Sequence, residues 1–259
     1  MHILVTNDDG VHAPGLLALV QAMRPLGDVT VLAPDRNWSG GGHVKTLHRP
    51  LRVGEATLAD GTPALTSDGA PSDCVALAML GRVPRVDLVV SGINSYGNLG
   101  HDVTYSGTVT AAMEAVIAGV PGLAFSLAAN ETTVERDYGP AADYARRIVG
   151  MAMEKGLSPD LLLNVNVPCI PAGDIRGIRV TRQGMRVYRD RLDERRDPRG
   201  VPYYWIGGDY PTGVPDNGTD FGALNDGYVS VTPLQLDLTD FPTAQRLSTW
   251  DWDQWVSVQ

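Results

Sequence analysis

Two adjacent carboxylates, Asp8 and Asp9, follow shortly after the apolar run at residues 3–5. Neighbouring acids repel each other unless a cation lies beside them, and carboxylate oxygens are good ligands for hard divalent cations. The pair can also be structural, with one aspartate capping a helix that begins near Pro14 and the other facing water. The residues that follow the other predicted strands bear on this choice.

A long loop follows the second predicted strand, residues 29–33, and carries Ser39 and a run of glycines at 40–42. Glycines allow backbone N–H groups, including that of Gly40, to approach a ligand closely, and Ser39 adds a hydroxyl. The composition predicts a ligand-binding loop.

The strand predicted at 86–90 is followed by SGINSYGNLG, residues 91–100. Its Asn94 and Asn98 carry side-chain oxygens that suit a metal or a substrate. Ser106, Gly107 and Thr108 then begin a helix predicted over residues 107–119, and a helix start exposes N–H donors that suit phosphate. An oxygen-ligated cation beside an anion site is what phosphoryl hydrolysis requires.

Short apolar runs alternate with amphipathic helical patterns through about residue 170, which predicts an α/β fold with a mostly parallel sheet. Ligands of such sheets bind beyond the carboxyl ends of the strands, so the loops above should meet at one edge. The predicted strands are 3–6, 29–33, 86–90, 122–127 and 161–167.

The composition is that of an ordinary globular protein, with 259 residues, 43% hydrophobic and 20% charged. A formal charge of −9 argues against a nucleic-acid polymer as partner, because such binding needs clustered Lys and Arg. Cys74 and Cys169 are far apart and are both expected to be buried. Neither a signal peptide nor a membrane-spanning stretch is visible, so we expect a cytoplasmic protein that does not bind a membrane.

The composition changes near residue 181, which suggests a core over 1–180 and a C-terminal extension over 181–259. Charged and then aromatic segments flank 198–200, a pattern that predicts a long hairpin. A hairpin alone buries little surface, so we expect it to pack against another subunit, the alternative being a loop folded back on its own domain. Residues 227–232 predict a final strand that returns to the core.

The motifs that carry these features occur in order along almost the whole chain, and with them the sequence resembles the SurE family of survival-protein nucleotidases. They are ILVTNDDG at 3–10, APDRNWSG at 33–40, SGIN at 91–94, GNLG at 97–100, YSGTV at 105–109, NVNVP at 164–168 and TRQ at 181–183.

The resemblance implies a Rossmann-like three-layer sandwich with a protruding C-terminal hairpin arm, at about 182–205, that is swapped in a homodimer or homotetramer. It implies a metal-dependent phosphatase of nucleoside 5′- and 3′-monophosphates, and in some members of short polyphosphate. One divalent cation per subunit, Mg²⁺ or Mn²⁺ with Co²⁺ as a further option, would bind Asp8, Asp9, Ser39 and Asn94. Asp8 and Asp9 would be catalytic. The substrate phosphate would meet Asn94, Asn98, Ser106, Gly107, Thr108 and Gly40.

One loop departs from the family pattern. Relatives commonly have Arg before the serine where this chain has Trp38, and His43 and Lys45 lie in a segment that is often small and hydroxyl-rich. His43 and His101 are candidate proton donors to the leaving oxygen, although a loop histidine is more often simply solvated.

Three other functions fit the sequence less well. A phosphatase with an aspartyl-phosphate intermediate would need its acids spaced as Asp-x-Asp. A non-catalytic nucleotide-binding module leaves the paired acids unexplained. A dinucleotide-dependent oxidoreductase needs a GxGxxG motif after the first strand, which is absent.

Overall fold

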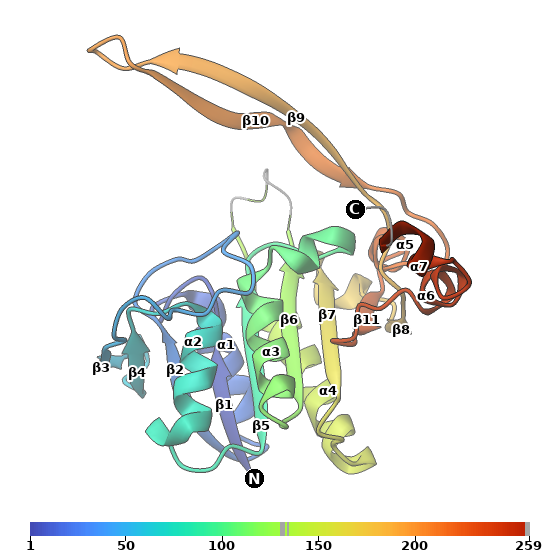
Figure 1. Ribbon diagram of the computed structural model, residues 1–259. Helices are drawn as coiled ribbons and strands as arrows, with labels where there is room; N and C mark the ends of the chain where they lie inside the picture. The colour runs from blue at the N-terminus through green and yellow to red at the C-terminus, as the bar shows by residue number, and fades with distance from the viewer. Residues whose placement is uncertain (130–132, 134, 257–259) are drawn as a thin grey trace.

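The computed structural model describes residues 1–129, 133 and 135–256. Within that part of the chain, nine strands form one sheet in the order β3-β4-β2-β1-β5-β6-β7-β11-β8 (Figure 1). The six strands from β4 to β7 are parallel, whereas β3 and β11 are antiparallel to their neighbours β4 and β7. The strands are β1 His2–Thr6, β2 Asp28–Pro34, β3 Val53–Thr57, β4 Pro63–Ser67, β5 Leu88–Asn94, β6 Gly122–Ala128, β7 Leu162–Pro168, β8 Ile178–Val180 and β11 Val229–Pro233.

Helices cover both faces of the sheet and make the predicted three layers (Figure 1). On one face, α1 (Pro14–Met23) and α4 (Gly139–Lys155) share an apolar cluster with the sheet. On the other face, α2 (Pro71–Leu77) and α3 (Gly107–Ile117) pack against it. Each fully buried Leu or Phe in these layers contributes about 1.5–3 kcal/mol to stability. Short helical turns are η1 Ala78–Arg82, η2 Gly100–Thr104 and η3 Ala172–Asp174.

The chain reverses direction across the sheet between β1 and β5. From β1 it moves outward to β2 and β4, and it then returns to the other side of β1 as β5. In open α/β sheets a crevice forms at such a switch point, beyond the carboxyl ends of the two strands. Asp8 and Asp9 follow β1 and Asn94 ends β5, so the fold brings these side chains to that crevice.

Two details differ from the sequence predictions. The strand predicted at 86–90 extends through the buried residues 91–94, so the ligand loop begins at Ser95. Gly92 makes this possible, because a Cβ there would lie 2.3 Å from the Phe125 carbonyl oxygen of β6. Cys74 is buried as expected, but Cys169 is only partly covered.

Strands β9 (Arg186–Arg196) and β10 (Pro202–Gly213) form a separate antiparallel hairpin that projects from the body (Figure 1). This arm extends to Gly213, further than the predicted 182–205. Strand β8 lies just before the predicted boundary at 181 and β11 well after it, and both join the main sheet. The core therefore includes a strand from the C-terminal extension.

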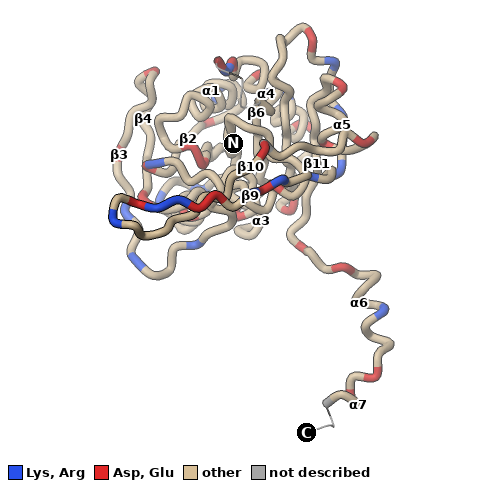
Figure 2. Tube along the Cα trace, turned by 90° about the horizontal axis from the view of Figure 1, so that it is seen from above, with Lys and Arg blue, Asp and Glu red and all other residues tan. Residues whose placement is uncertain are grey.

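Beyond β11, the helices α6 (Phe241–Leu247) and α7 (Trp252–Val256) lie away from the body (Figure 2). The Asp and Arg residues of β9 make the arm strongly charged (Figure 2). Helix α5 (Asp220–Asn225) packs near β11. Trp250 and Trp252 contact each other at 5.3 Å between ring centroids, yet both are exposed. No helix in the described residues is both long enough and apolar enough to cross a membrane.

Candidate metal and phosphate site

Asp8 and Asp9 follow β1 with their charges largely removed from water. Asp8 is buried and Asp9 half-buried. Burial raises the pKa of Asp8, and burial together with the Asp8 charge raises the pKa of Asp9 to about 6. The positive charge of Arg136 lowers the pKa of Asp9 only in part. Among the ion pairs between described residues, none involves either aspartate.

The start of α3 holds Asp8 in place. The Thr108 hydroxyl donates a hydrogen bond to Asp8 Oδ1. Backbone N–H groups of Gly107 and Thr108 also lower the pKa of Asp8 by hydrogen bonding to it. Gly107 permits this approach, since a Cβ there would lie 2.7 Å from Asp8 Cβ. Asp8 therefore takes donors of a helix start, which partly explains how a buried carboxylate is stabilised.

The alternative in which one aspartate caps the helix that begins near Pro14 was wrong. The N-cap of α1 is Ala13, which makes no side-chain cap, so neither aspartate caps that helix. Proline at the first position begins α1 instead. Asp8 instead accepts hydrogen bonds from the first turn of α3, a helix about a hundred residues away in the chain.

Ser39 and Asn94 approach Asp8 from the two neighbouring strands. The Trp38 N–H donates to the Asp8 carbonyl oxygen at 2.7 Å, which places exposed Ser39 next to the acid. The Asn94 side-chain nitrogen donates to the Tyr96 carbonyl oxygen at 2.7 Å, so its side-chain oxygen is the atom presented for coordination. Both positions follow from the order β2-β1-β5 in the sheet.

These groups line one cavity of about 260 Å³. The sequence-predicted residues in its wall are Asp8, Ser39, Gly40, Asn94, Asn98 and Ser106. Gly107 and Thr108 lie directly behind Asp8. Asp9 borders a second hollow of about 420 Å³, together with Arg36 and Arg136. The two acids thus face adjacent spaces around the same strand end.

The donor atoms fit a hard divalent cation. They are two carboxylates, one hydroxyl and one amide oxygen, which is the oxygen-rich chemistry that Mg²⁺ and Mn²⁺ prefer. Across the described ranges no cluster of three His, Cys, Asp or Glu could hold a metal, so the softer ligand sets typical of zinc are absent there. A buried acid with hydrogen bonds but no basic ion-pair partner is the further sign that a cation belongs beside it.

The predicted phosphate ligands have other partners in addition. The Ser106 hydroxyl accepts from the Val109 N–H at 3.1 Å and caps α3. The Asn98 side chain donates to Ser126 Oγ at 2.8 Å, while its backbone accepts from Asn164 at 2.8 Å. These contacts fix the loop 95–99 against β6 and β7. Their role toward phosphate stays a prediction.

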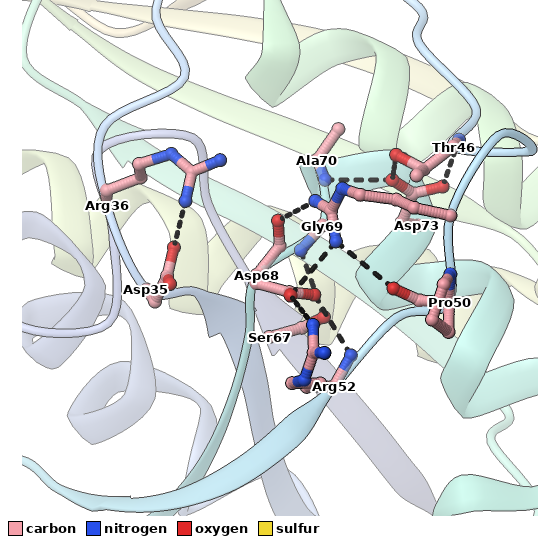
Figure 3. A network of polar contacts seen from close by, with 11 residues as sticks. Asp35, Arg36, Thr46, Pro50, Arg52, Ser67, Asp68, Gly69, Ala70 and Asp73 are labelled. Carbon is pink, nitrogen blue, oxygen red and sulfur yellow. Dashed lines mark hydrogen bonds and ion pairs between the residues drawn. The ribbon is translucent and has the colours of Figure 1, made fainter.

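The loop that carries Ser39 is fastened to α3 and α2. His43 Nε2 lies 3.0 Å and Lys45 Nζ 2.9 Å from the two carboxylate oxygens of buried Glu114. Thr46 donates to Asp73 through both its N–H and its hydroxyl (Figure 3). His43 is thus held on Glu114. It does not line the cavity, and neither does exposed His101, so the structure does not support either histidine as a proton donor.

Sequence reasoning missed a group of residues at the base of the arm. Arg186 lines the cavity of Asp8, and its Nε lies 2.9 Å from Asp102 Oδ2. Tyr188 donates to Asp102 Oδ1 at 2.5 Å, and burial with this bond raises the pKa of the Tyr188 hydroxyl. The Arg186 side chain is 10% exposed, although β9 is exposed from Tyr188 onward. No local pattern distinguishes Arg186 from the other arginines of that strand.

Comparisons with known proteins agree with this arrangement. A family model described as survival protein SurE matches residues 3–190. A 5′-nucleotidase SurE from Herpetosiphon aurantiacus is 57% identical over 98% of this chain and 99% of its own length. One from Chloroflexus aggregans is 52% identical over 98% of this chain and 100% of its own.

A solved structure is also similar. The crystal structure of the SurE protein from Aquifex aeolicus has a TM-score of 0.78 at 41% identity, and the match covers 96% of this chain and 98% of that chain. The match thus extends over almost the whole length of both chains.

Proposed function

Because this chain belongs to the SurE family, we propose that it is a metal-dependent phosphatase that hydrolyses nucleoside 5′- and 3′-monophosphates, with short polyphosphate as a further substrate. The observation that carries the proposal is the convergence of Asp8, Ser39 and Asn94 on one cavity at the β1–β5 switch point. This places oxygen ligands beside the start of α3, where an anion is favoured.

Asp8, Asp9, Ser39 and Asn94 are the residues that would hold one divalent cation, Mg²⁺, Mn²⁺ or Co²⁺. When bound, such a cation lowers the pKa of a water molecule and polarises a phosphoryl oxygen. Thr108 would keep the Asp8 carboxylate in one orientation.

Other groups of the chain would accept a proton and bind the phosphate. The Asp9 carboxylate, beside Asp8 at the end of β1, suits the acceptance of a proton from the attacking water. Gly40, Asn98 and Ser106 line the cavity, and their polar groups would meet the phosphate oxygens. An aspartyl-phosphate route is less favoured, because the Asp8 carboxylate is buried and engaged with Thr108.

We further propose that copies of the chain associate through the arm as a homodimer or homotetramer. The arm's outer surface carries large apolar side chains that the body does not cover, among them Leu192, Trp205 and Ile206 at 71%, 61% and 83% exposure. Apolar groups gathered on a projecting hairpin favour a protein partner, and a second copy would bring an arm of the same kind.

The test is phosphate release from a panel of nucleoside 5′- and 3′-monophosphates, glycerol phosphate and tripolyphosphate, with several metals. We expect EDTA to abolish turnover and Mn²⁺ or Mg²⁺ to restore it. Full turnover after exhaustive chelation would reject the metal site. Tight nucleotide binding without phosphate release would favour the non-catalytic alternative.

A further inference from the structure

Another hollow, distinct from the one beside Asp9, adjoins the cavity of Asp8 and has no role so far. Its volume is about 350 Å³, and it shares Gly97 and Arg186 with that cavity. Ligand pockets span roughly 300–1,000 Å³, so the hollow is large enough for one flat ring system. We call it the Phe221 hollow, after the aromatic side chain in its wall.

The wall of the Phe221 hollow is mostly apolar. Leu99, Ala128, Pro168 and Ile170 join Phe221, and Asn225 is one of the few polar side chains in it. Apolar side chains together with the polar ends of Asn225 and Arg186 suit a nucleobase, whose faces are poorly hydrated and whose edge forms hydrogen bonds.

The hollow beside Asp9 is a weaker candidate for a base. Its wall contains the charged side chains of Asp9, Asp35, Arg36 and Arg136. Placing an uncharged base among them would remove these charges from water and offer them no new partner. The hollow also shares no wall residue with the cavity of Asp8, Ser39 and Asn94.

Arg186 stands at the junction of the cavity and the Phe221 hollow. Asp102 holds its Nε at 2.9 Å, and its guanidinium carbon lies 5.6 Å from the centre of the Phe221 ring. A guanidinium carries five donors in a fixed plane, so this anchoring sets the direction of its other N–H groups as well. A substrate whose phosphate lies in the cavity would pass this point. The positive Arg186 side chain would then lie beside the link between the phosphate and the rest of the substrate.

We infer that the Phe221 hollow binds the nucleoside part of the substrate while the phosphate lies in the cavity of Asp8, with Arg186 at the join. The inference rests on the proposed function, since it assigns the base to a place in the same site. It makes the hollow the element that distinguishes nucleotides from simple phosphate esters.

The first test narrows the hollow from its rim. Ile170 is 36% exposed, so Ile170→Trp adds bulk without repacking the core. Ile178, 40% exposed on β8, is not in the wall, and Ile178→Trp is the matched control. We expect Ile170→Trp to raise the KM for adenosine monophosphate at least about tenfold and to leave kcat/KM for glycerol phosphate within about twofold. Equal changes for both substrates, or none for either, would contradict the inference.

The second test does not depend on turnover. Cys169 lies in the wall of the Phe221 hollow and is partly exposed, whereas Cys74 is fully buried and serves as an internal control. We expect a maleimide to label Cys169, and adenosine to slow this labelling at least about threefold while inorganic phosphate does not.

Unchanged labelling with adenosine, or no labelling of Cys169 at all, would overturn the inference. If adenosine protects Cys169 but no ester is hydrolysed, the proposed function fails while the nucleoside site stands. If nucleotides are hydrolysed without any protection, the nucleoside site alone fails.

Discussion

The Thr108 hydroxyl donates a hydrogen bond to Oδ1 of Asp8, and this contact joins the first turn of α3 to the end of β1. The two residues are 100 positions apart, so the bond forms only when the switch point of the sheet is assembled. It fixes the direction of the Asp8 carboxylate at the edge of the cavity.

Replacing Thr108 by Val should weaken metal binding. The substitution keeps the shape of the side chain but leaves the Asp8 carboxylate with one donor fewer. Losing such an orienting contact typically lowers metal affinity roughly 10- to 100-fold. Calorimetric titration of the metal-free protein with Mn²⁺ measures it. Thr108→Ser keeps the hydroxyl and should stay near wild type, so an equal loss in both variants would argue against an orienting role.

Asp9→Asn should abolish phosphate release and at the same time stabilise the metal-free protein. The folded pKa of Asp9 is about 6, above its ordinary value of 3.8, so its contribution to stability is present below about pH 4 and lost as the pH rises through about 6. The loss is about 3 kcal/mol, and the Asn variant does not incur it.

Urea unfolding of the EDTA-treated protein between pH 4.5 and 7.5 measures this difference. The gap between Asp9→Asn and wild type should widen with pH. A gap that does not change with pH would mean that Asp9 is not destabilised in the fold, and retained activity would remove Asp9 from the mechanism.

Glu114→Gln should reduce metal affinity through the loop of Ser39. Glu114 is the buried acceptor for both His43 and Lys45, and its charge holds the loop against α3. Weakening this pair of contacts by about 1–2 kcal/mol should raise the Mn²⁺ dissociation constant roughly 5- to 30-fold, while kcat at saturating metal changes little.

Asp143→Asn is the matched control for Glu114. It removes an acid that also holds two basic residues, Arg146 and Arg147, but on the outer side of α4. We expect no change in metal affinity. A fall in kcat at saturating Mn²⁺ for Glu114→Gln would instead place Glu114 in the chemistry.

Shortening the arm should lower the mass of the assembly. Gly208 pairs with Asp190 across the hairpin, so an Asn-Gly turn can replace residues 191–207 and leave Arg186 and Tyr188 in place. Light scattering should then report a smaller species. Ile206→Asp tests the same surface by one substitution, and Leu80→Asp, at a similarly exposed site on the body, is its control. An unchanged mass for both arm variants would contradict association through the arm.

Much of the body could be predicted because its signals are local. The predicted strand at 3–6 is observed as His2–Thr6, and Asp8 follows it. The helix predicted over 107–119 is observed as Gly107–Ile117, and Ser106 precedes it. The parallel order of the sheet then brings separate loops to one edge, which is why Ser39 and Asn94 could be grouped without coordinates.

Other features depend on contacts that no local pattern encodes. Arg186 lies in the cavity wall because the arm passes η2, where Asp102 forms an ion pair with it. The other arginines of β9 have similar neighbours in the sequence. The pairing of His43 with Glu114 spans 71 positions, and a loop histidine alone does not reveal it. The hydrogen bond from Thr108 of α3 to Asp8 likewise required the assembled sheet.

Arg186 and Tyr188 both contact Asp102 at the edge of the cavity, and both belong to the first residues of the arm. The base of the hairpin therefore forms part of the wall of the cavity of Asp8. If copies of the chain associate through the hairpin, contacts at its tip would restrict Arg186, and a substrate that restricts Arg186 would by reciprocity change the strength of that association. Turnover and self-association would then respond to each other, so specific activity would vary with protein concentration.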